Sequence, residues 1–445
     1  MNPHIMHLGY KEHTSDQMSV PSLYQQSVKA FVKQLNHLPN HEVKILELQV
    51  LPMVALKSVL KEMSCYPSLR EKLHQELSNP VVFIRMFMGC ESDRLVLQHC
   101  LREASLIGKS VLPEVARNWC KMVCENKSKT DSSVIKNKIT EAIELGTYLH
   151  EAGWASQSKE VLDIALQMFS QLTEDQHNKT LKIICMQKLL RAEVCAVMLS
   201  EADTTCSALL TMIEGITDNA ILISVFLEVA HHHRRAERFA DFNSWTRKAM
   251  ELMTKSTSTE LVLRFLQLEA VNLTLLKRYE PAGMLINQAI LRARNQYGEF
   301  HRQYAGAIYT HGLYLLKINA FSYAIPILLE LLDLISKLYG SYTPHIVIIR
   351  SFLAYAYYRR SQPSGQLYIA YSHIQIAIAQ AKQIMPERQE VINHFCKFSE
   401  MIRKGHERGL TAARENSAIR VNDSKVLDVE EIKQKCFELH DDLDV

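Results

Sequence analysis

Two stretches, NQAILRARNQYG at 287–298 and LELLDLISKLYG at 329–340, contain the pattern that decides the fold. Both are amphipathic, and both end in a Tyr-Gly pair, so that Gly298 and Gly340 lie 42 residues apart. A glycine directly after a helix takes the left-handed conformation at little cost, and each pair therefore predicts the end of a helix. Recurrence at this distance predicts a helical repeat rather than an irregular bundle.

Small and bulky residues recur upstream of each Tyr-Gly pair with spacings of four and three. The two sets are Ala282, Ile286, Ala289 and Ala324, Leu328, Leu331. Such spacing places each set on one face of a helix. Small residues there let two helices pack closely as a hairpin, as in the tetratricopeptide pattern.

The same register starts at five residues, here called the hairpin positions: Gly146, Ala230, Ala270, Gly312 and Ala354. Their separations are 84, 40, 42 and 42 residues, and the first gap equals two periods. One degenerate repeat is therefore expected at 178–214. The sequence predicts an all-α chain in which about six tetratricopeptide-like hairpins span 134–385 and form a right-handed superhelix with a concave groove.

The segments outside the repeats differ in character. Residues 1–20 are expected to be disordered, and 21–124 predict a helical docking region without the 42-residue period. The polar stretch at 125–133 reads as a linker. Residues 386–445 are expected to form a polar tail with an acidic end.

The composition excludes several classes of protein. Only 14 Gly and 12 Pro occur among 445 residues, too few for dinucleotide folds, barrels or sandwiches rich in glycine turns. A formal net charge of +3 argues against a dedicated nucleic-acid surface. The longest apolar segment, 323–335, is interrupted by Pro326, Glu330 and Asp333, and no transmembrane segment is expected.

No motif for catalysis, for a cofactor or for a metal ion is present. The ten cysteines form no CxxC pair, and phosphate-binding loops, HExxH and GxSxG are absent. His231, His232 and His233 are consecutive, and consecutive residues of a helix point in different directions, so they are not expected to share a metal. The chain is expected not to be an enzyme.

The repeat register assigns a candidate peptide groove to first-helix residues near each hairpin turn. Aromatic and charged side chains in a concavity suit an extended peptide, with cations available for its carboxylates. For any single residue, an ordinary solvated side chain is the alternative. The candidates are His150, Glu151, His231, Arg234, Arg235, Tyr309, Lys317, Tyr355, Tyr358 and Arg359.

Several stretches together resemble the amyloid protein-binding protein 2 family, whose tetratricopeptide array is related to that of kinesin light chain. The resemblance covers roughly 20–385. It is carried by ELGTYLHEAGWASQSKEVL at 144–162, NSWTRKAMELM at 243–253, INQAILRARNQYGEFHRQYAGAIYTHGLYLL at 286–316 and LAYAYYRRSQPSGQLYIAYSHIQIAIA at 353–379. This family implies a substrate receptor of cullin-2 RING ubiquitin ligases.

Such a receptor implies a docking segment at 22–46 for elongin B/C and cullin-2. The elongin-binding pattern is matched by Ser22, Leu23, Ser27 and Phe31, with Ser27 in place of the usual Cys, and the cullin pattern by Leu38, Pro39 and Leu46. Glu42 stands where that second pattern has an apolar residue. Apolar side chains such as Leu23 and Phe31 are expected to fill an apolar pocket on a partner.

The resemblance therefore implies a non-catalytic adaptor that binds peptide segments of target proteins, of the carboxyl-terminal degron type, in its groove. The alternative is a cargo adaptor linking membrane proteins such as amyloid precursor protein to microtubule transport. The expected location is cytoplasm and nucleus, with cytoskeletal or membrane association under the alternative.

Overall fold

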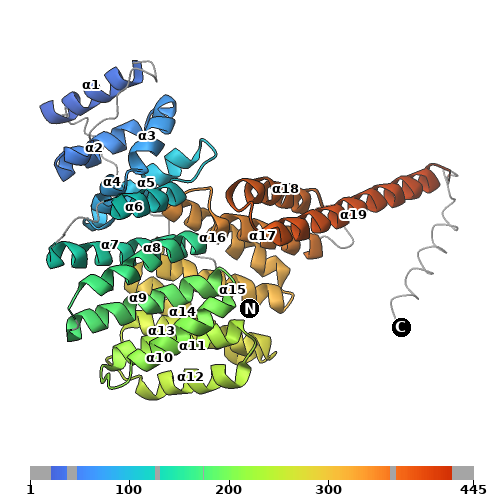
Figure 1. Cartoon of the computed structure of the whole chain (residues 1–445). Helices are drawn as coiled ribbons and strands as arrows, with labels where there is room; N and C mark the ends of the chain where they lie inside the picture. Colours follow the sequence, from blue (N-terminus) through green and yellow to red (C-terminus); the bar gives the residue numbers. More distant parts are fainter. Residues whose placement is uncertain (1–21, 38–47, 126–130, 174, 361–366, 423–445) are drawn as a thin grey trace.

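The computed structural model describes residues 22–37, 48–125, 131–173, 175–360 and 367–422, with side chains described as far as Gly405. Every regular element within these ranges is helical (Figure 1). No helix in the described ranges combines the length and the apolar character needed to cross a bilayer. The all-helical fold predicted from the sequence is confirmed.

An amino-terminal group of helices precedes the repeats. Asn79 begins one of them, because its side chain accepts a hydrogen bond from the Val81 amide and Pro80 occupies the first turn. The core of this group contains the fully buried Phe83 and Trp119. Its α-helices are α1 (Leu23–His37), α2 (Met53–Met63), α3 (Arg70–Leu77), α4 (Pro80–Phe87), α5 (Glu91–Ser105) and α6 (Leu112–Glu125), with 3-10 turns η1 (Leu48–Val50) and η2 (Pro67–Leu69).

Six helical hairpins follow, each made of a first helix and a second helix. The first helices are α7 (Ser132–Glu151), α9 (Gln176–Cys195), α11 (Asn219–Arg235), α13 (Thr259–Leu275), α15 (Arg302–Lys317) and α17 (Pro344–Arg360). The second helices are α8 (Ala155–Met168), α10 (Leu199–Met212), α12 (Phe239–Leu252), α14 (Tyr279–Tyr297), α16 (Phe321–Tyr339) and α18 (Leu367–Ile384), with the 3-10 turn η3 (Phe169–Gln171) after α8.

Close contact at the hairpin positions explains the small residues of the repeat. A Cβ atom at Gly146 would lie only 2.7 Å from Cγ of Leu162, and one at Gly312 only 2.9 Å from Cδ2 of Leu328. The Ser158 hydroxyl also donates a hydrogen bond to the Gly146 carbonyl at 2.7 Å. Side chains at these glycines would push the paired helices apart.

Helices α9 and α10 occupy the segment expected to hold the degenerate repeat. Their packing keeps the register, with Leu190 at the hairpin position and the buried Ala202, Cys206 and Leu209 at the three partner positions. Leu190 is large where the other repeats have glycine or alanine at the hairpin position. The sequence pattern of this repeat is weak for this reason.

Each of the first five hairpin turns contains one residue in the left-handed conformation. These residues are Gly153, Val197, Glu237, Lys277 and Asn319, with φ between 60° and 94°. Only the first is glycine, although the conformation costs other residues about 1 kcal/mol or more. The repeat therefore builds its turns with little glycine, which agrees with the low glycine content of the chain.

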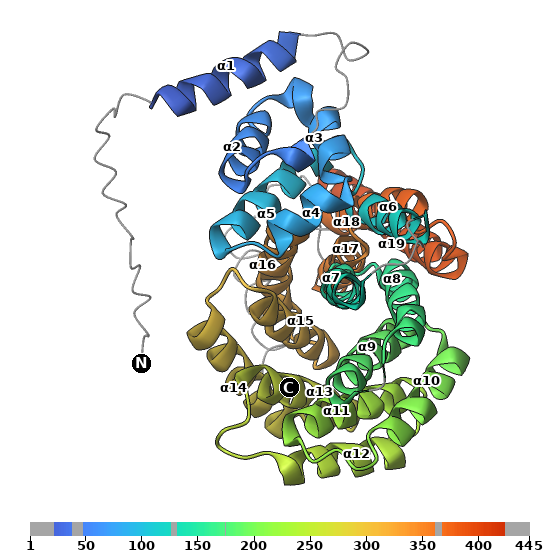
Figure 2. The same ribbon diagram turned by 60° about the vertical axis from the view of Figure 1, so that its left-hand side comes forward.

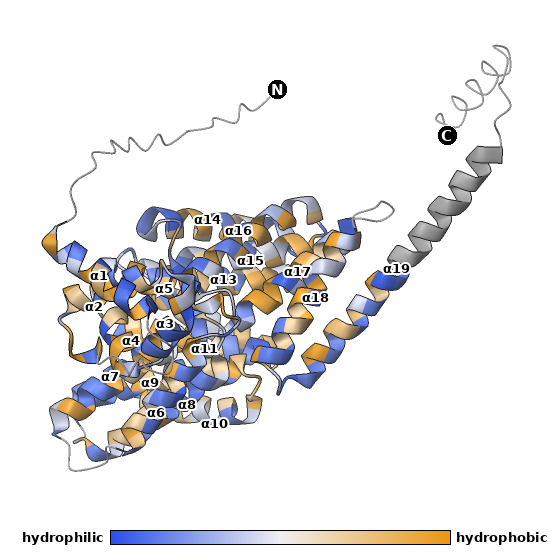
Figure 3. Cartoon of the chain, turned by 90° about the horizontal axis from the view of Figure 1, so that it is seen from above, coloured by the Kyte–Doolittle hydropathy of each residue, from blue (hydrophilic) through white to orange (hydrophobic). Residues whose placement is uncertain are grey.

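The carboxyl-terminal segment differs from the predicted polar tail. Residues 389–422 form one long helix, α19 (Gln389–Asn422), which leaves the body of the molecule at its far end (Figures 1 and 3). Its first half packs on α18 and α17 through the buried Ile392, Phe395 and Ile402. The prediction of a tail starting at 386 is wrong for this half of the helix, because its apolar residues recur at helical spacing.

The superhelix curves until its fifth and sixth hairpins meet the first (Figure 2). The Tyr148 hydroxyl donates to the Leu338 carbonyl at 2.9 Å, and its ring lies 5.1 Å from that of Tyr339. The amino-terminal group of helices joins this contact, because the Ser341 amide donates to the Ser105 hydroxyl at 3.0 Å. The predicted concave groove is therefore enclosed by its own ends rather than open along its length.

Candidate functional site

The first helices of all six hairpins line a polar cavity of about 270 Å³ that is partly open to solvent. A second hollow of about 150 Å³ adjoins it. The two share Arg191, His231, Arg264, Gln267 and Thr310, from α9, α11, α13 and α15. We call both together the inner cavity.

Basic side chains outnumber acidic ones in the inner cavity. The basic residues are Lys188, Arg191, Arg234, Arg264 and Arg302. The acidic residues are Glu151, Glu228 and Glu260. An excess of positive charge inside a protein raises the local potential and favours an anionic ligand.

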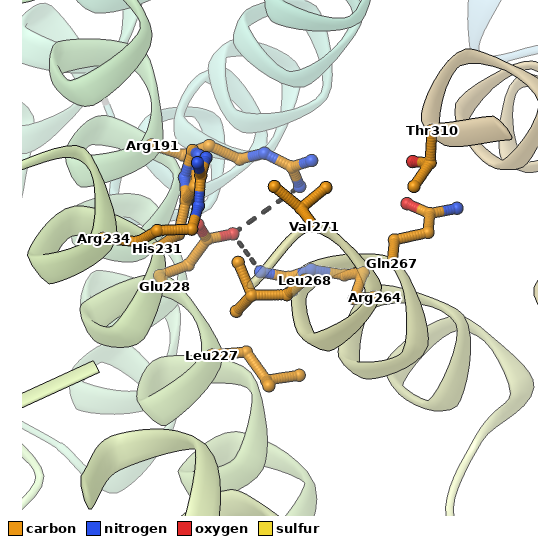
Figure 4. A pocket seen from close by; sticks show the side chains of 10 residues that line it. All are labelled: Arg191, Leu227, Glu228, His231, Arg234, Arg264, Gln267, Leu268, Val271 and Thr310. Carbon is orange, nitrogen blue, oxygen red and sulfur yellow. Dashed lines mark hydrogen bonds and ion pairs between the residues drawn. The ribbon is translucent and has the colours of Figure 1, made fainter. Parts of the chain in front are cut away.

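Glu228 neutralises two of the arginines. Its carboxylate is 2% exposed, pairs with Arg264 and lies 3.5 Å from Arg191 (Figure 4). Arg264 also donates a hydrogen bond to the Ser224 hydroxyl at 3.2 Å. A buried carboxylate needs such partners, because an unpaired charge would be costly away from water. This cluster connects α9, α11 and α13 at the wall of the inner cavity.

A second ion pair joins the first and fifth hairpins across the cavity. Nη1 of Arg302, on α15, lies 3.1 Å and 3.0 Å from the two carboxylate oxygens of Glu151, on α7. The negative charge of Glu151 raises the pKa of Arg302 above its ordinary value. The pair therefore holds the fifth hairpin against the first.

Three histidines in the cavity wall are held in the neutral form. Burial lowers the pKa of His345 to about 4. Burial, reinforced by nearby arginines, also lowers the pKa values of His150 and His231 well below the ordinary value. Near neutral pH the positive charge of the cavity thus comes from arginine and lysine alone.

The predicted groove residues separate into two groups. His150, Glu151, His231, Tyr309 and Arg234 lie in the wall of the inner cavity. The other five, Arg235, Lys317, Tyr355, Tyr358 and Arg359, do not line it.

Tyr355 and Tyr358 have a structural role instead. Their rings lie 6.4 Å and 5.7 Å from that of Phe398 on α19. Arg359 donates a hydrogen bond to the Tyr355 hydroxyl at 2.8 Å and lies over the ring of Phe321. These three residues pack near the start of α19 and do not line the inner cavity, and their place in a peptide groove stays a prediction.

The histidine run on α11 serves three different contacts. His231 faces the inner cavity, and Nε2 of the fully buried His232 lies 2.8 Å from Oδ1 of Asp203. Nδ1 of His233 lies 3.7 Å from Asp241. Within the described residues, no group of histidine, cysteine and acidic side chains is arranged to hold a metal ion.

The predicted elongin-binding residues lie together on the exposed side of α1. Leu23 is 81% exposed and Phe31 39% exposed, and Ser27 lies between them with its hydroxyl bonded to the Leu23 carbonyl at 2.9 Å. Val32 and Leu35, on another side of the helix, are buried. Leu38, Pro39 and Leu46, like Glu42, lie outside the described residues.

Several residues of the inner cavity were not predicted from the sequence. Lys188 and Arg191 belong to the degenerate repeat, whose register could not be assigned without a small hairpin residue. Arg264, Gln267 and Glu260 lie in the first half of α13, whereas only positions near the hairpin turns were considered. The residues Ala202, Cys206 and Leu209 have the spacing of four and three that marks the other repeats, and this pattern could have assigned the register of the degenerate repeat.

Comparison with known proteins gives distant relatives. Amyloid protein-binding protein 2 of Rattus norvegicus is 23% identical over 320 residues, which are 71% of this chain and 54% of the relative. The Mus musculus protein of the same name matches equally. The chain is distantly related to amyloid protein-binding protein 2. It spans about half the length of these curated relatives, and no protein-family model matches it.

Comparison with solved structures gives two weak matches. One is BtubC (BKLC) from P. vanneervenii, with a TM-score of 0.39 and 15% identity over 53% of this chain and 91% of the other. The other is an ATPase of the STAND class with a tetratricopeptide repeat sensor, PH0952 from Pyrococcus horikoshii. Its TM-score is 0.41, with 11% identity over 91% of this chain and 65% of the other.

Proposed function

We propose that this chain is a non-catalytic adaptor that docks on elongin B/C through α1 and holds a segment of a target protein in its helical repeats. In this proposal a cullin-2 RING ubiquitin ligase supplies the ubiquitin-transfer chemistry, and the chain supplies recognition. Distant relatives named for binding amyloid protein support a protein-binding role.

The exposed apolar side of α1 is the observation that carries the docking proposal. Leu23 and Phe31 lie eight residues apart on one side of the helix, whereas Val32 and Leu35 fix α1 to the body from another. Large apolar side chains on a helix that is already anchored are typical of anchors for a partner pocket. Burying both would contribute about 3 kcal/mol or more to binding.

Pull-down with purified elongin B/C tests this proposal. We expect the full chain to retain elongin B/C and the double variant Leu23→Ala, Phe31→Ala to lose most of it. Lys29→Gln with Lys33→Gln is the matched control, because both lysines are exposed on another side of α1. Equal retention by the wild type and the alanine variant would contradict the docking surface.

Cargo binding is the second candidate, and the name of the relatives favours it. Here the repeats would hold a cytoplasmic segment of a membrane protein and link it to microtubule transport. Co-sedimentation of the chain with microtubules in the absence of elongin B/C would support this candidate. Failure to co-sediment, together with retention of elongin B/C, would favour the ligase adaptor.

A further inference from the structure

Two basic residues of the inner cavity have no acidic partner. Glu228 pairs with Arg191 and Arg264, and Glu151 pairs with Arg302. Among the residues that the structure describes, neither Lys188 nor Arg234 has a carboxylate within ion-pair distance. Burial and the neighbouring Arg264 and Arg191 lower the pKa of Lys188. Lys188 is half-buried. An ammonium group that is partly removed from water among like charges is costly, and a bound anion would relieve that cost.

The cavity wall also has buried hydrogen-bond donors without acceptors. Nε of Arg234 and Nε2 of Gln267 have no hydrogen-bond partner in the described part of the chain. Both groups can only donate. Nδ1 of His150 and of His345 are also unpartnered, and a neutral imidazole has one N–H to offer. Since buried polar atoms are nearly always bonded, the missing component is an acceptor.

These groups come from different sides of one space. Figure 4 shows His231, Arg234 and Arg191 gathered beside Glu228, with Arg264 and Gln267 on the neighbouring helix. Lys188, His150 and His345 belong to the adjoining wall. The arrangement thus combines surplus positive charge with surplus donors around one partly open cavity. A ligand that fits both is small, negatively charged and rich in acceptors.

We propose that the inner cavity is an oxyanion-binding site that takes a carboxylate or phosphate group, with Lys188 and Arg234 as the uncompensated cations. If the proposed function holds, the anion is an acidic or phosphorylated side chain of the bound target segment, so this assignment of its source rests on that function. A cavity of about 270 Å³ has room for one such side chain. Arginine and lysine both bind these groups with charge-assisted hydrogen bonds.

Titration of the full chain with three small probes tests this proposal. The probes are inorganic phosphate, N-acetylglutamate amide and the uncharged N-acetylglutamine amide, at constant ionic strength and pH 7.5. Isothermal titration calorimetry and thermal shift measure binding. We expect saturable binding of at least one anionic probe and none of the glutamine probe. Binding of phosphate alone would indicate that the ligand is a phosphorylated side chain. Binding of N-acetylglutamate amide alone would indicate an acidic side chain. Binding of both would indicate a site for either oxyanion.

Substitutions of Lys188 and Arg234 test whether the anion binds in the inner cavity. Lys188→Met and Arg234→Gln should each weaken anion binding at least tenfold, whereas Lys182→Met, on the same helix but not in the cavity wall, should not. Melting without ligand shows whether each variant folds, and removing the unpaired charge of Lys188 should not lower its stability.

Two results would overturn the inference. One is the absence of saturable binding of either anion to the wild type, and the other is unchanged binding in both cavity variants. The elongin contact is on α1 and outside the cavity, so retention of elongin B/C together with no anion binding would leave the proposed function standing.

Discussion

The Tyr148 hydroxyl donates a hydrogen bond to the carbonyl oxygen of Leu338, which lies 190 residues further along the chain. Leu338 is in the last turn of α16, where carbonyl groups have no partner within the helix. Tyr148, on α7, therefore caps a helix of the fifth hairpin. This contact joins the first hairpin to the fifth and closes the superhelix into a ring around the inner cavity.

Removing the hydroxyl in Tyr148→Phe should lower the free energy of unfolding by about 1–3 kcal/mol, because the Leu338 carbonyl loses its partner in a buried place. Denaturant unfolding measures the loss. Hydrogen exchange should also become faster at 338–345, where the closing contact lies, because local opening needs less energy there.

The matched control is Tyr314→Phe. Its hydroxyl donates to the Tyr279 carbonyl at 3.1 Å and joins neighbouring hairpins only. Faster exchange at 338–345 in this control as well, or no change there in Tyr148→Phe, would show that the Tyr148 contact does not hold the ring closed.

Gly146→Ala should destabilise the first hairpin by about 1–3 kcal/mol. The new methyl group would lie 2.7 Å from Cγ of Leu162, so α7 and α8 must separate. Gly405→Ala is the control, because a Cβ there meets Leu367 at an ordinary 3.7 Å and alanine favours the helix. Thermal melting compares the two variants, and equal or opposite shifts would contradict the hairpin packing described.

Acid should destabilise the chain partly through His345. Its pKa is about 4 in the folded chain and near 6.5 when unfolded, so between these values the unfolded chain binds more protons. Stability is therefore lost as pH falls from about 6.5 towards 4. His345→Gln removes this term, and the wild type should lose about 1–2 kcal/mol more than the variant between pH 7.5 and 5. Parallel pH profiles of unfolding would contradict a buried neutral His345.

The hairpins could be predicted because their packing depends on local spacing. Gly312 and Leu328 lie sixteen residues apart, and their contact recurs wherever the register does. The left-handed turns at Val197, Glu237 and Lys277 gave no sequence signal, because packing of the hairpin imposes the conformation on residues that do not favour it.

The closure of the ring could not be predicted, because small rotations between successive hairpins add up along the array. Glu151 was placed in the groove, but its partner Arg302 depends on that accumulated curvature. The same holds for Tyr358, which α19 covers. Contacts between residues of distant repeats are therefore the feature of the site that the sequence predicts least well.

Size-exclusion chromatography of the full chain with purified elongin B/C, followed by addition of cullin-2, tests whether the chain docks on elongin B/C through α1. We expect the chain and elongin B/C to elute as one complex, and Leu23→Ala with Phe31→Ala to abolish this shift while the repeats stay folded. Separate elution of the wild-type chain and elongin B/C at micromolar concentrations would contradict this docking.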